Sequence, residues 1–175
     1  MIGRCGDDEL EKICDVINDG ARAYRGVIAA DRWHEPYMPM QELEREIAAG
    51  VAFWGFHEGG RLLGVMGIQP VQDVRLIRHA YTRTKAQGRG VGSALLAHLT
   101  AVKDPPMLVG TWRAAAWAVD FYRARGFELV AEEEKVACCA ATGRSRSARS
   151  RSPWCCATRG SGARTLRSRR SPSAR

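Results

Sequence analysis

The sequence has no run of about 18 or more apolar residues, and this excludes a membrane-spanning helix of ordinary length. Its N-terminal segment is acidic and lacks the apolar core of a secretory signal peptide. We therefore expect a cytoplasmic protein with no membrane partner. The 175 residues, of which 45% are hydrophobic, suffice for one globular domain with a buried core.

Acidic residues are absent from 136–175, although this segment holds 10 of the 27 basic residues. Residues 1–135 keep 17 basic and 19 acidic residues, so their net charge is −2 while the whole chain carries +8. The basic segment is dominated by Arg and Ser and shows no apolar period. This composition predicts a folded domain over 1–135 and a disordered tail over 136–175.

Cysteines with the spacing of a metal site are also missing. Cys5 and Cys14 stand alone, and the tail contains the adjacent pairs Cys138/Cys139 and Cys155/Cys156. Ligand cysteines are usually separated by about two to four residues, so that both sulfurs can face one ion. We therefore expect no metal site.

Two common phosphate loops are absent, because neither GxxxxGK[ST] nor GxGxxG is present. Instead, Gly88, Gly90 and Gly92 alternate within YTRTKAQGRGVGSALLAHL, between a strand-like and a helix-like segment. Glycine allows exposed backbone N–H groups at the start of a helix to approach an anion closely. The spacing favours a phosphate-binding turn, and an ordinary glycine-rich turn is the alternative.

The hydrophobic periods predict an order of elements for the rest of the domain. Helices are expected at 10–24, 40–49, 90–102 and 114–125, and Asp7 or Asp8 is expected to cap the first. Strands are expected at 1–5, 51–57, 61–71, 74–82, 105–112 and 127–133. This order predicts an α/β (α+β) fold with a mixed antiparallel and parallel sheet and helices on both faces.

Two motifs together point to a family. QGRGVG at 87–92 fits the pattern Q/R-x-x-G-x-G/A, and FYRARGFEL follows at 121–129. In this order the motifs resemble those of the GNAT superfamily of N-acetyltransferases. The resemblance implies acetyl-CoA as co-substrate and direct transfer of its acetyl group to a primary amine in a ternary complex. A non-catalytic acyl-CoA-binding module is the alternative function.

The resemblance also implies the cofactor site. Backbone N–H groups of the turn would bind the pyrophosphate, the end of the fourth strand would align the pantetheine arm, and N–H groups of that strand would steady the oxyanion. The implied cofactor-binding residues are Tyr81, Thr82, Gln87, Gly88, Arg89, Gly90, Val91, Gly92, Ser93, Ala115 and Tyr122. Ala115 departs from the family, which often has asparagine there.

The catalytic residues follow less directly. Tyr122 matches the tyrosine that protonates the departing thiolate, although it could instead be a half-buried tyrosine whose hydroxyl faces water. The candidates for the general base are His79 and, in the aromatic loop, Glu35 or His34, and packing within a strand is the alternative role for His79. The aromatic loop suggests Trp33, His34 and Tyr37 as acceptor-binding residues, together with Trp112. The acceptor itself is unreadable, and homodimerisation is left open.

The tail departs from the family pattern, in which one more strand completes the sheet after GFELV. We expect that strand to be missing and the sheet edge to be open. A frameshift is our hypothesis, since 136–143 can be encoded so that reading from the third base gives Gly-Leu-Leu-Arg-Arg-Tyr-Trp. The rival interpretation is a basic nucleic-acid-binding tail, but RGG repeats and interleaved aromatic residues are lacking.

Overall fold

The computed structural model describes residues 1–101, 105–129 and 154–159. Its seven-stranded sheet has the order β1-β2-β3-β4-β5-β7-β6. The strands are β1 Ile2–Arg4, β2 Ala52–Glu58, β3 Arg61–Val71, β4 Val74–Thr82, β5 Met107–Trp112, β6 Glu128–Leu129 and β7 Trp154–Arg159. The helices are α1 Leu10–Ala21, α2 Met40–Ala48, α3 Val91–Thr100 and α4 Ala116–Arg123. The predicted order of elements is confirmed, as is the mixed sheet, in which β4 and β5 are parallel and the other neighbours antiparallel.

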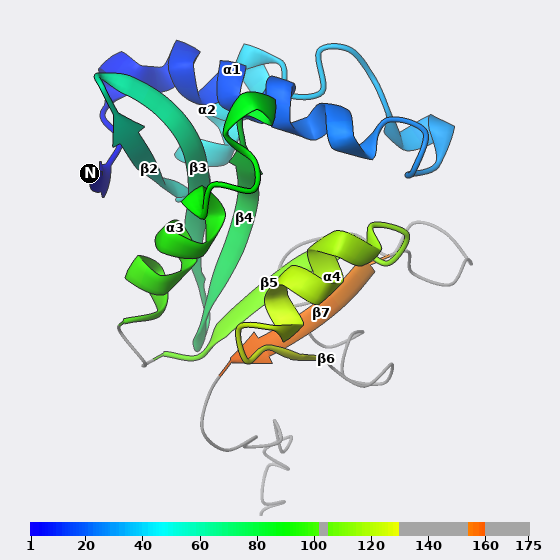
Figure 1. Cartoon of the computed structure of the whole chain (residues 1–175). Helices are drawn as coiled ribbons and strands as arrows, with labels where there is room; N and C mark the ends of the chain where they lie inside the picture. The colour runs from blue at the N-terminus through cyan, green and yellow to red at the C-terminus, as the bar shows by residue number, and fades with distance from the viewer. Residues whose placement is uncertain (102–104, 130–153, 160–175) are drawn as a thin grey trace, which may run out of the picture.

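Two hydrophobic clusters attach the helices to opposite faces of the sheet. Leu95 and Leu96 of α3 pack with Met66 and Ile77 on one face, and this cluster also includes Tyr122 of α4. The apolar stripes of α1 and α2 pack against β2 and β3 on the other face. Figure 1 shows α3 and α4 in front of the sheet and α2 behind it. The period-3.6 stripes of the sequence thus become the contacts that fix the layers.

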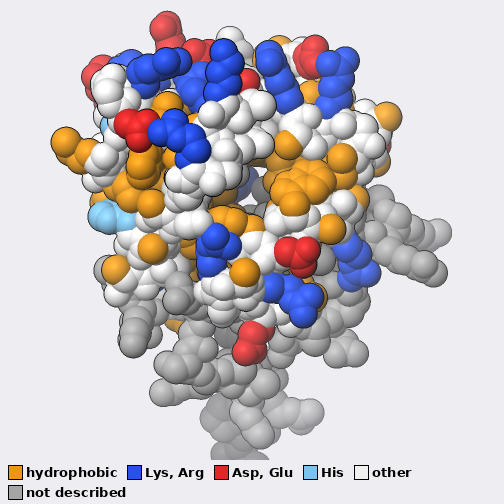
Figure 2. Space-filling view, viewed as in Figure 1, with side chains coloured by type: hydrophobic (Ala, Val, Ile, Leu, Met, Phe, Trp, Pro, Cys, Tyr) orange, Lys and Arg blue, Asp and Glu red, His pale blue; other side chains and the backbone are white. Residues whose placement is uncertain are grey.

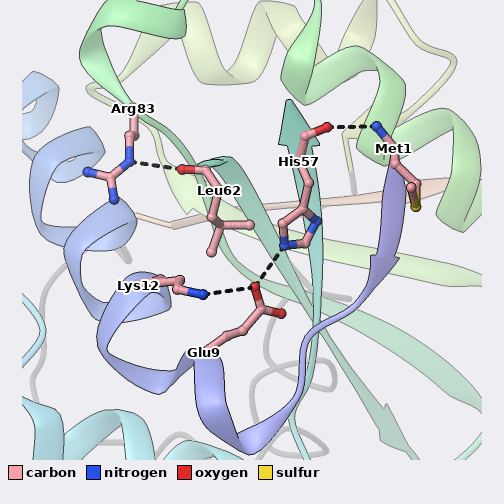
Figure 3. A network of polar contacts seen from close by, with 6 residues as sticks. All are labelled: Met1, Glu9, Lys12, His57, Leu62 and Arg83. Atoms are coloured by element: carbon pink, nitrogen blue, oxygen red, sulfur yellow. Dashed lines mark hydrogen bonds and ion pairs between the residues drawn. The ribbon is translucent and has the colours of Figure 1, made fainter. Parts of the chain in front are cut away.

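A small polar network ties the N-terminus to the β2–β3 hairpin (Figure 3). The Met1 ammonium donates to the carbonyl oxygen of His57 at 2.7 Å, and Nε2 of His57 lies 2.8 Å from Oε1 of Glu9. The hydrogen bond with His57 is the main cause that lowers the pKa of Glu9. Nε of Arg83 donates to the carbonyl oxygen of Leu62 at 2.9 Å, so the end of β4 is also held to β3.

The central strands separate part-way along their length. β4 and β5 pair only over Arg75–Ile77 and Met107–Val109 within the described residues. Beyond that point β4 stays on β3 as far as Thr82, while β5 stays on β7 as far as Trp112. Figure 1 shows the resulting V-shaped fork between the two strands. The backbone edges inside the fork are therefore available to a ligand that adds like a strand.

Two expectations from the sequence are wrong. The final strand is not missing, because β7 lies between β5 and β6 and pairs with both. Strand pairing uses backbone hydrogen bonds, and 154–159 contains no glycine, proline or acid that would oppose it. The start of α1 has no side-chain cap, and Asp7 and Asp8 form a 3-10 turn instead. The remainder of the predicted tail lies outside the described residues.

Within the residues that the structure describes, no helix is both long and apolar enough to cross a bilayer. No group of three or more His, Cys, Asp or Glu side chains in the same residues is arranged to hold a metal ion.

Candidate active site

The glycine turn joins β4 to α3 at the open end of the fork (Figure 1). Gly88 and Gly90 have φ angles of 76° and 81°, a left-handed backbone that residues with a Cβ rarely adopt. Gly90 is the N-cap of α3 and has no side chain to cap the helix. Among the described residues, the backbone N–H groups of 88–93 have no hydrogen-bond acceptor. These donors and the positive end of the helix dipole form a cradle for an anion.

Neighbouring elements hold this turn in place. The Thr84 N–H donates to Oδ2 of Asp19 at 2.7 Å, which ties the turn to the end of α1. Nε2 of Gln87 donates to the carbonyl oxygen of Thr82 at 3.4 Å. Arg89, however, is engaged elsewhere, because its Nη2 lies 2.6 Å from Oε2 of Glu58 on the β2–β3 hairpin. The cradle therefore consists of backbone N–H groups, and in this structure the Arg89 side chain is directed toward the hairpin instead.

The four tyrosines of the chain converge at the fork. The Tyr81 ring lies edge-on to Tyr24 and Tyr37, with centroids 6.1 and 6.0 Å apart. Burial raises the pKa of Tyr81 well above its ordinary value, and the neighbouring Tyr37, Tyr24 and Tyr122 add to this shift. Figure 2 shows a hollow near the centre of this face, with hydrophobic side chains on either side of it. The fork is therefore lined by aromatic rings that carry hydroxyl donors.

Tyr122 is buried on α4, with 6% of its surface exposed. Burial raises its pKa well above the ordinary value for tyrosine, and the neighbouring Tyr24 adds to this shift. The hydroxyl therefore keeps its proton at neutral pH, as a general acid must. Its burial contradicts the alternative interpretation of a half-buried hydroxyl facing water.

His79 lies at a bulge of β4. Its φ angle is +49°, and the pairing of β4 with β3 shifts register between Val65 and Gly67. At this bulge both Arg78 and His79 face Glu46 of α2, with Arg78 Nη2 at 2.8 Å from Oε1 and His79 Nε2 at 3.2 Å from Oε2. The His79 ring also stacks on Phe53 at 6.0 Å. A bulge next to the fork thus positions a half-buried histidine whose Nε2 faces a carboxylate.

The aromatic loop packs close to the same fork. Trp33 and Tyr37 pack against a buried cluster that contains Trp112 and Ala115. His34 stacks on Tyr37, and its Nδ1 lies 2.7 Å from the carbonyl oxygen of Pro36. The predicted acceptor residues and Ala115 are therefore brought together. Glu35 is not, because its carboxylate is exposed and pairs with Arg25 at 3.3 Å.

Comparison with known proteins decides the family. The profile described as "Acetyltransferase (GNAT) domain" matches residues 17–142, which is more than half of the chain. The chain belongs to the GNAT acetyltransferase family. Its co-substrate is therefore acetyl-CoA.

Individual relatives agree with this assignment. The GNAT chain is 30% identical over 130 residues to the peptidyl-lysine N-acetyltransferase YiaC of Escherichia coli, with 74% of this chain and 84% of that protein covered. The PaiA N-acetyltransferase of Thermoplasma acidophilum, solved with coenzyme A, has a TM-score of 0.67 at 14% identity, with 92% and 98% coverage. The ribosomal-protein-S18-alanine N-acetyltransferase of Escherichia coli has a TM-score of 0.60 at 16% identity, with 75% and 79% coverage. The two structures show the same fold.

Sequence reasoning missed three residues of this site. Tyr24 follows α1 and joins the tyrosine cluster, Thr111 of β5 is buried and influences the pKa of Tyr24, and Glu46 faces His79. Glu46 follows a helix pattern typical of an exposed position, so nothing in the local sequence marks it. Thr111 and Tyr24 become neighbours only through the fold. Only the polar position of Thr111 within an apolar strand could have drawn attention.

Proposed function

We propose that this GNAT enzyme acetylates a primary amine at the end of a flexible aliphatic chain, such as a lysine side chain. The observation that carries the proposal is the convergence of all four tyrosines on the fork, opposite the pyrophosphate cradle. Aromatic rings attract an ammonium group and also pack against the methylenes that precede it. YiaC, whose name gives peptidyl-lysine as its substrate, supports this choice of acceptor.

The mechanism assigns separate roles along the fork. The thioester lies between the edges of β4 and β5, and backbone N–H groups of β4 near the bulge stabilise the oxyanion. Tyr122, which stays protonated, donates its proton to the departing thiolate. A thiol with a pKa near 8.5 leaves readily, so this acid contributes about one to two orders of magnitude in rate.

His79 is the better-placed general base. Because its Nε2 faces the Glu46 carboxylate, Nδ1 is the nitrogen left to accept a proton from the amine or from a bridging water. Glu35 sits on the surface and is neutralised by Arg25. The variant His79→Asn tests this assignment, since asparagine tolerates the left-handed backbone that the bulge requires. We expect kcat/KM to fall by about 100-fold or more at neutral pH and to recover partly at high pH, where the amine deprotonates unaided. Retained activity in this variant, with loss in Glu35→Gln, would transfer the role to Glu35.

The amine class is tested by release of free coenzyme A thiol. The full chain is incubated with acetyl-CoA and, in turn, a lysine-containing peptide with a blocked N-terminus, the same peptide with arginine for lysine, and a peptide with only a free N-terminal amine. We expect turnover with the first peptide alone. Turnover only with the free N-terminus would refute the lysine-like acceptor. Cofactor binding without turnover by any amine would favour the non-catalytic acyl-CoA-binding module.

The remaining expectations stay proposals. We infer a cytoplasmic location and a domain that extends past residue 135 to include β7. We also infer that the acetylated amine, rather than nucleic acid, is the main partner, because the basic excess lies in 136–175 and the body is slightly acidic. Size-exclusion chromatography with light scattering decides between a monomer and a homodimer.

A further inference from the structure

Arg125 connects the two motifs of the cofactor site. It follows α4, and its guanidinium lies 3.9 Å from the centroid of the Phe121 ring. Its Nη1 donates to the carbonyl oxygen of Phe121 at 2.7 Å, and its Nη2 donates to Oγ of Ser93 at 2.5 Å. Ser93 is in the first turn of α3, directly after the cradle. The guanidinium is therefore fixed beside the pyrophosphate-binding N–H groups.

The charge of Arg125 lacks an acidic partner. In the ranges that the structure describes, no carboxylate lies within ion-pair distance of this half-buried guanidinium. The carbonyl end of α4 compensates part of its charge, but the guanidinium also faces the positive N-terminal end of α3. A positive charge beside the N-terminal end of α3 is unfavourable unless an anion binds between the guanidinium and that end of the helix.

Arg89 shows the contrast. It lies within the glycine turn itself, yet its guanidinium is paired with Glu58, and both side chains are about half exposed. Its charge is therefore paired with a carboxylate on the surface, whereas that of Arg125 is directed toward the head of α3. The basic residue within the turn motif, Arg89, is therefore not the residue that supplies an unpaired charge, which is Arg125.

The geometry points to Arg125 as a binding residue for the pyrophosphate of coenzyme A. Two of the five guanidinium N–H donors are used by Phe121 and Ser93, which leaves the others for phosphate oxygens. The planar guanidinium can contact two phosphate oxygens at once, and the contact to Ser93 orients the Ser93 hydroxyl toward the same ligand. Ring stacking and the main-chain contact hold the group in place before the cofactor arrives, which lowers the entropic cost of binding.

The test measures the affinity of the full chain for three probes by calorimetry: coenzyme A, dephospho-coenzyme A, which lacks the 3′-phosphate, and pantetheine, which lacks all phosphates. We expect Arg125→Gln to weaken the affinity for coenzyme A and for dephospho-coenzyme A by the same factor, about tenfold, and to leave the affinity for pantetheine unchanged. Arg123→Gln is the matched control, because it removes one exposed charge from the last residue of α4, two positions before Arg125. It should change each affinity by less than about twofold.

Other outcomes overturn the proposal. An equal loss for pantetheine would show that Arg125 only holds α4 to α3, and a loss confined to coenzyme A would move the contact to the 3′-phosphate. No loss for any probe would remove the role altogether. If Arg125→Gln fails to fold, as judged by thermal unfolding, Arg125→Lys replaces it. Lysine keeps the charge but lacks the planar group with several donors. An affinity for coenzyme A equal to that of wild type would therefore refute a two-oxygen contact. Because the readout is binding, it does not depend on which amine is acetylated.

Discussion

Replacing Gly20 by alanine tests whether the close approach of α1 to the end of β4 is required by the cofactor site. Gly20 lies in the last turns of α1, where an added Cβ would stand 2.8 Å from the carbonyl oxygen of Thr82 and 3.1 Å from Cβ of Tyr81. Ordinary carbon–oxygen contacts begin near about 3.4 Å, so α1 and β4 must separate by roughly 0.6 Å. Neither atom belongs to a flexible side-chain tip, so the shift falls on the backbone.

The magnitude follows from two opposing effects of this substitution. Overpacking a close contact of this kind costs about 1–3 kcal/mol, whereas alanine gains up to about 1 kcal/mol over glycine as a helix former. We therefore expect the free energy of unfolding of Gly20→Ala to fall by about 1–2 kcal/mol. Because Thr82 ends the strand that would align the pantetheine arm, the KM for acetyl-CoA should rise several-fold, more than kcat falls.

Urea unfolding and steady-state thiol release measure the two quantities. Gly3→Ala is the control, since an added Cβ at this position of β1 meets nothing within 4 Å. If Gly20→Ala proves as stable as Gly3→Ala and keeps the wild-type KM, the contact between α1 and β4 does not constrain the cofactor site. A loss of stability with an unchanged KM would refute only the role of Thr82.

Two further predictions concern single side chains. Tyr122→Phe should lower kcat by about 10- to 100-fold with little change in the KM for acetyl-CoA, measured by thiol release; a wild-type kcat would remove Tyr122 as the acid. The lowered pKa of Glu9 means that the unfolded chain binds its proton more readily, so the stability that Glu9 adds is present above the unfolded carboxyl pKa and lost as pH falls through the folded one. Urea titrations from about pH 6 to about pH 3 should therefore show a steeper loss in wild type than in Glu9→Gln, and parallel curves would contradict this.

The sequence predicted the parts of this enzyme that depend on local pattern. Alternating and helical periods place β3, β4 and α2 within a residue or so of their bounds, because their buried faces repeat along the chain. The cradle was predictable because its three glycines, Gly88, Gly90 and Gly92, alternate within one short stretch of the sequence. The tyrosine cluster was not, because its members come from four separate segments that only the fold brings together.

Two details needed the backbone geometry itself. Alternation along β4 would place Arg78 and His79 on opposite faces, and only the bulge turns both toward Glu46. The left-handed backbone of His79 cannot be predicted from its residue type, since most residues with a Cβ avoid that conformation. Likewise, Arg89 looks like the natural phosphate ligand until the hairpin places Glu58 beside it. In both cases a side chain from a distant segment, Glu46 or Glu58, shows where the residue points.

The strand β7 bears on the frameshift hypothesis. It occupies an inner position of the sheet, flanked by β5 and β6, so apolar residues are expected on the face of this strand that the domain buries. The sequence at this place is Pro153-Trp154-Cys155-Cys156, within an otherwise Arg/Ser-rich segment. Tryptophan has one codon, TGG, and cysteine has two, TGT and TGC. The alternative reading of this stretch is therefore nearly independent of codon choice.

Read from the third base of the Pro153 codon, these four codons give three residues. The first is Leu, Val or Met, the second is Val and the third is Leu. The pair Cys138/Cys139 likewise becomes Leu, Val or Met followed by Leu, in agreement with the Leu-Leu of the reading given above. One shifted frame thus supplies apolar residues both at β7 and at the start of the tail. A net loss of one base near codon 136 would explain the Arg/Ser composition, the cysteine pairs and the inner strand together. Resequencing the gene decides the matter, and mass spectrometry that finds a tryptic peptide with Trp154 and both adjacent cysteines would refute the frameshift. With the frame restored, the chain should unfold at a higher temperature, because β7 would then contribute apolar burial to the sheet beside β5.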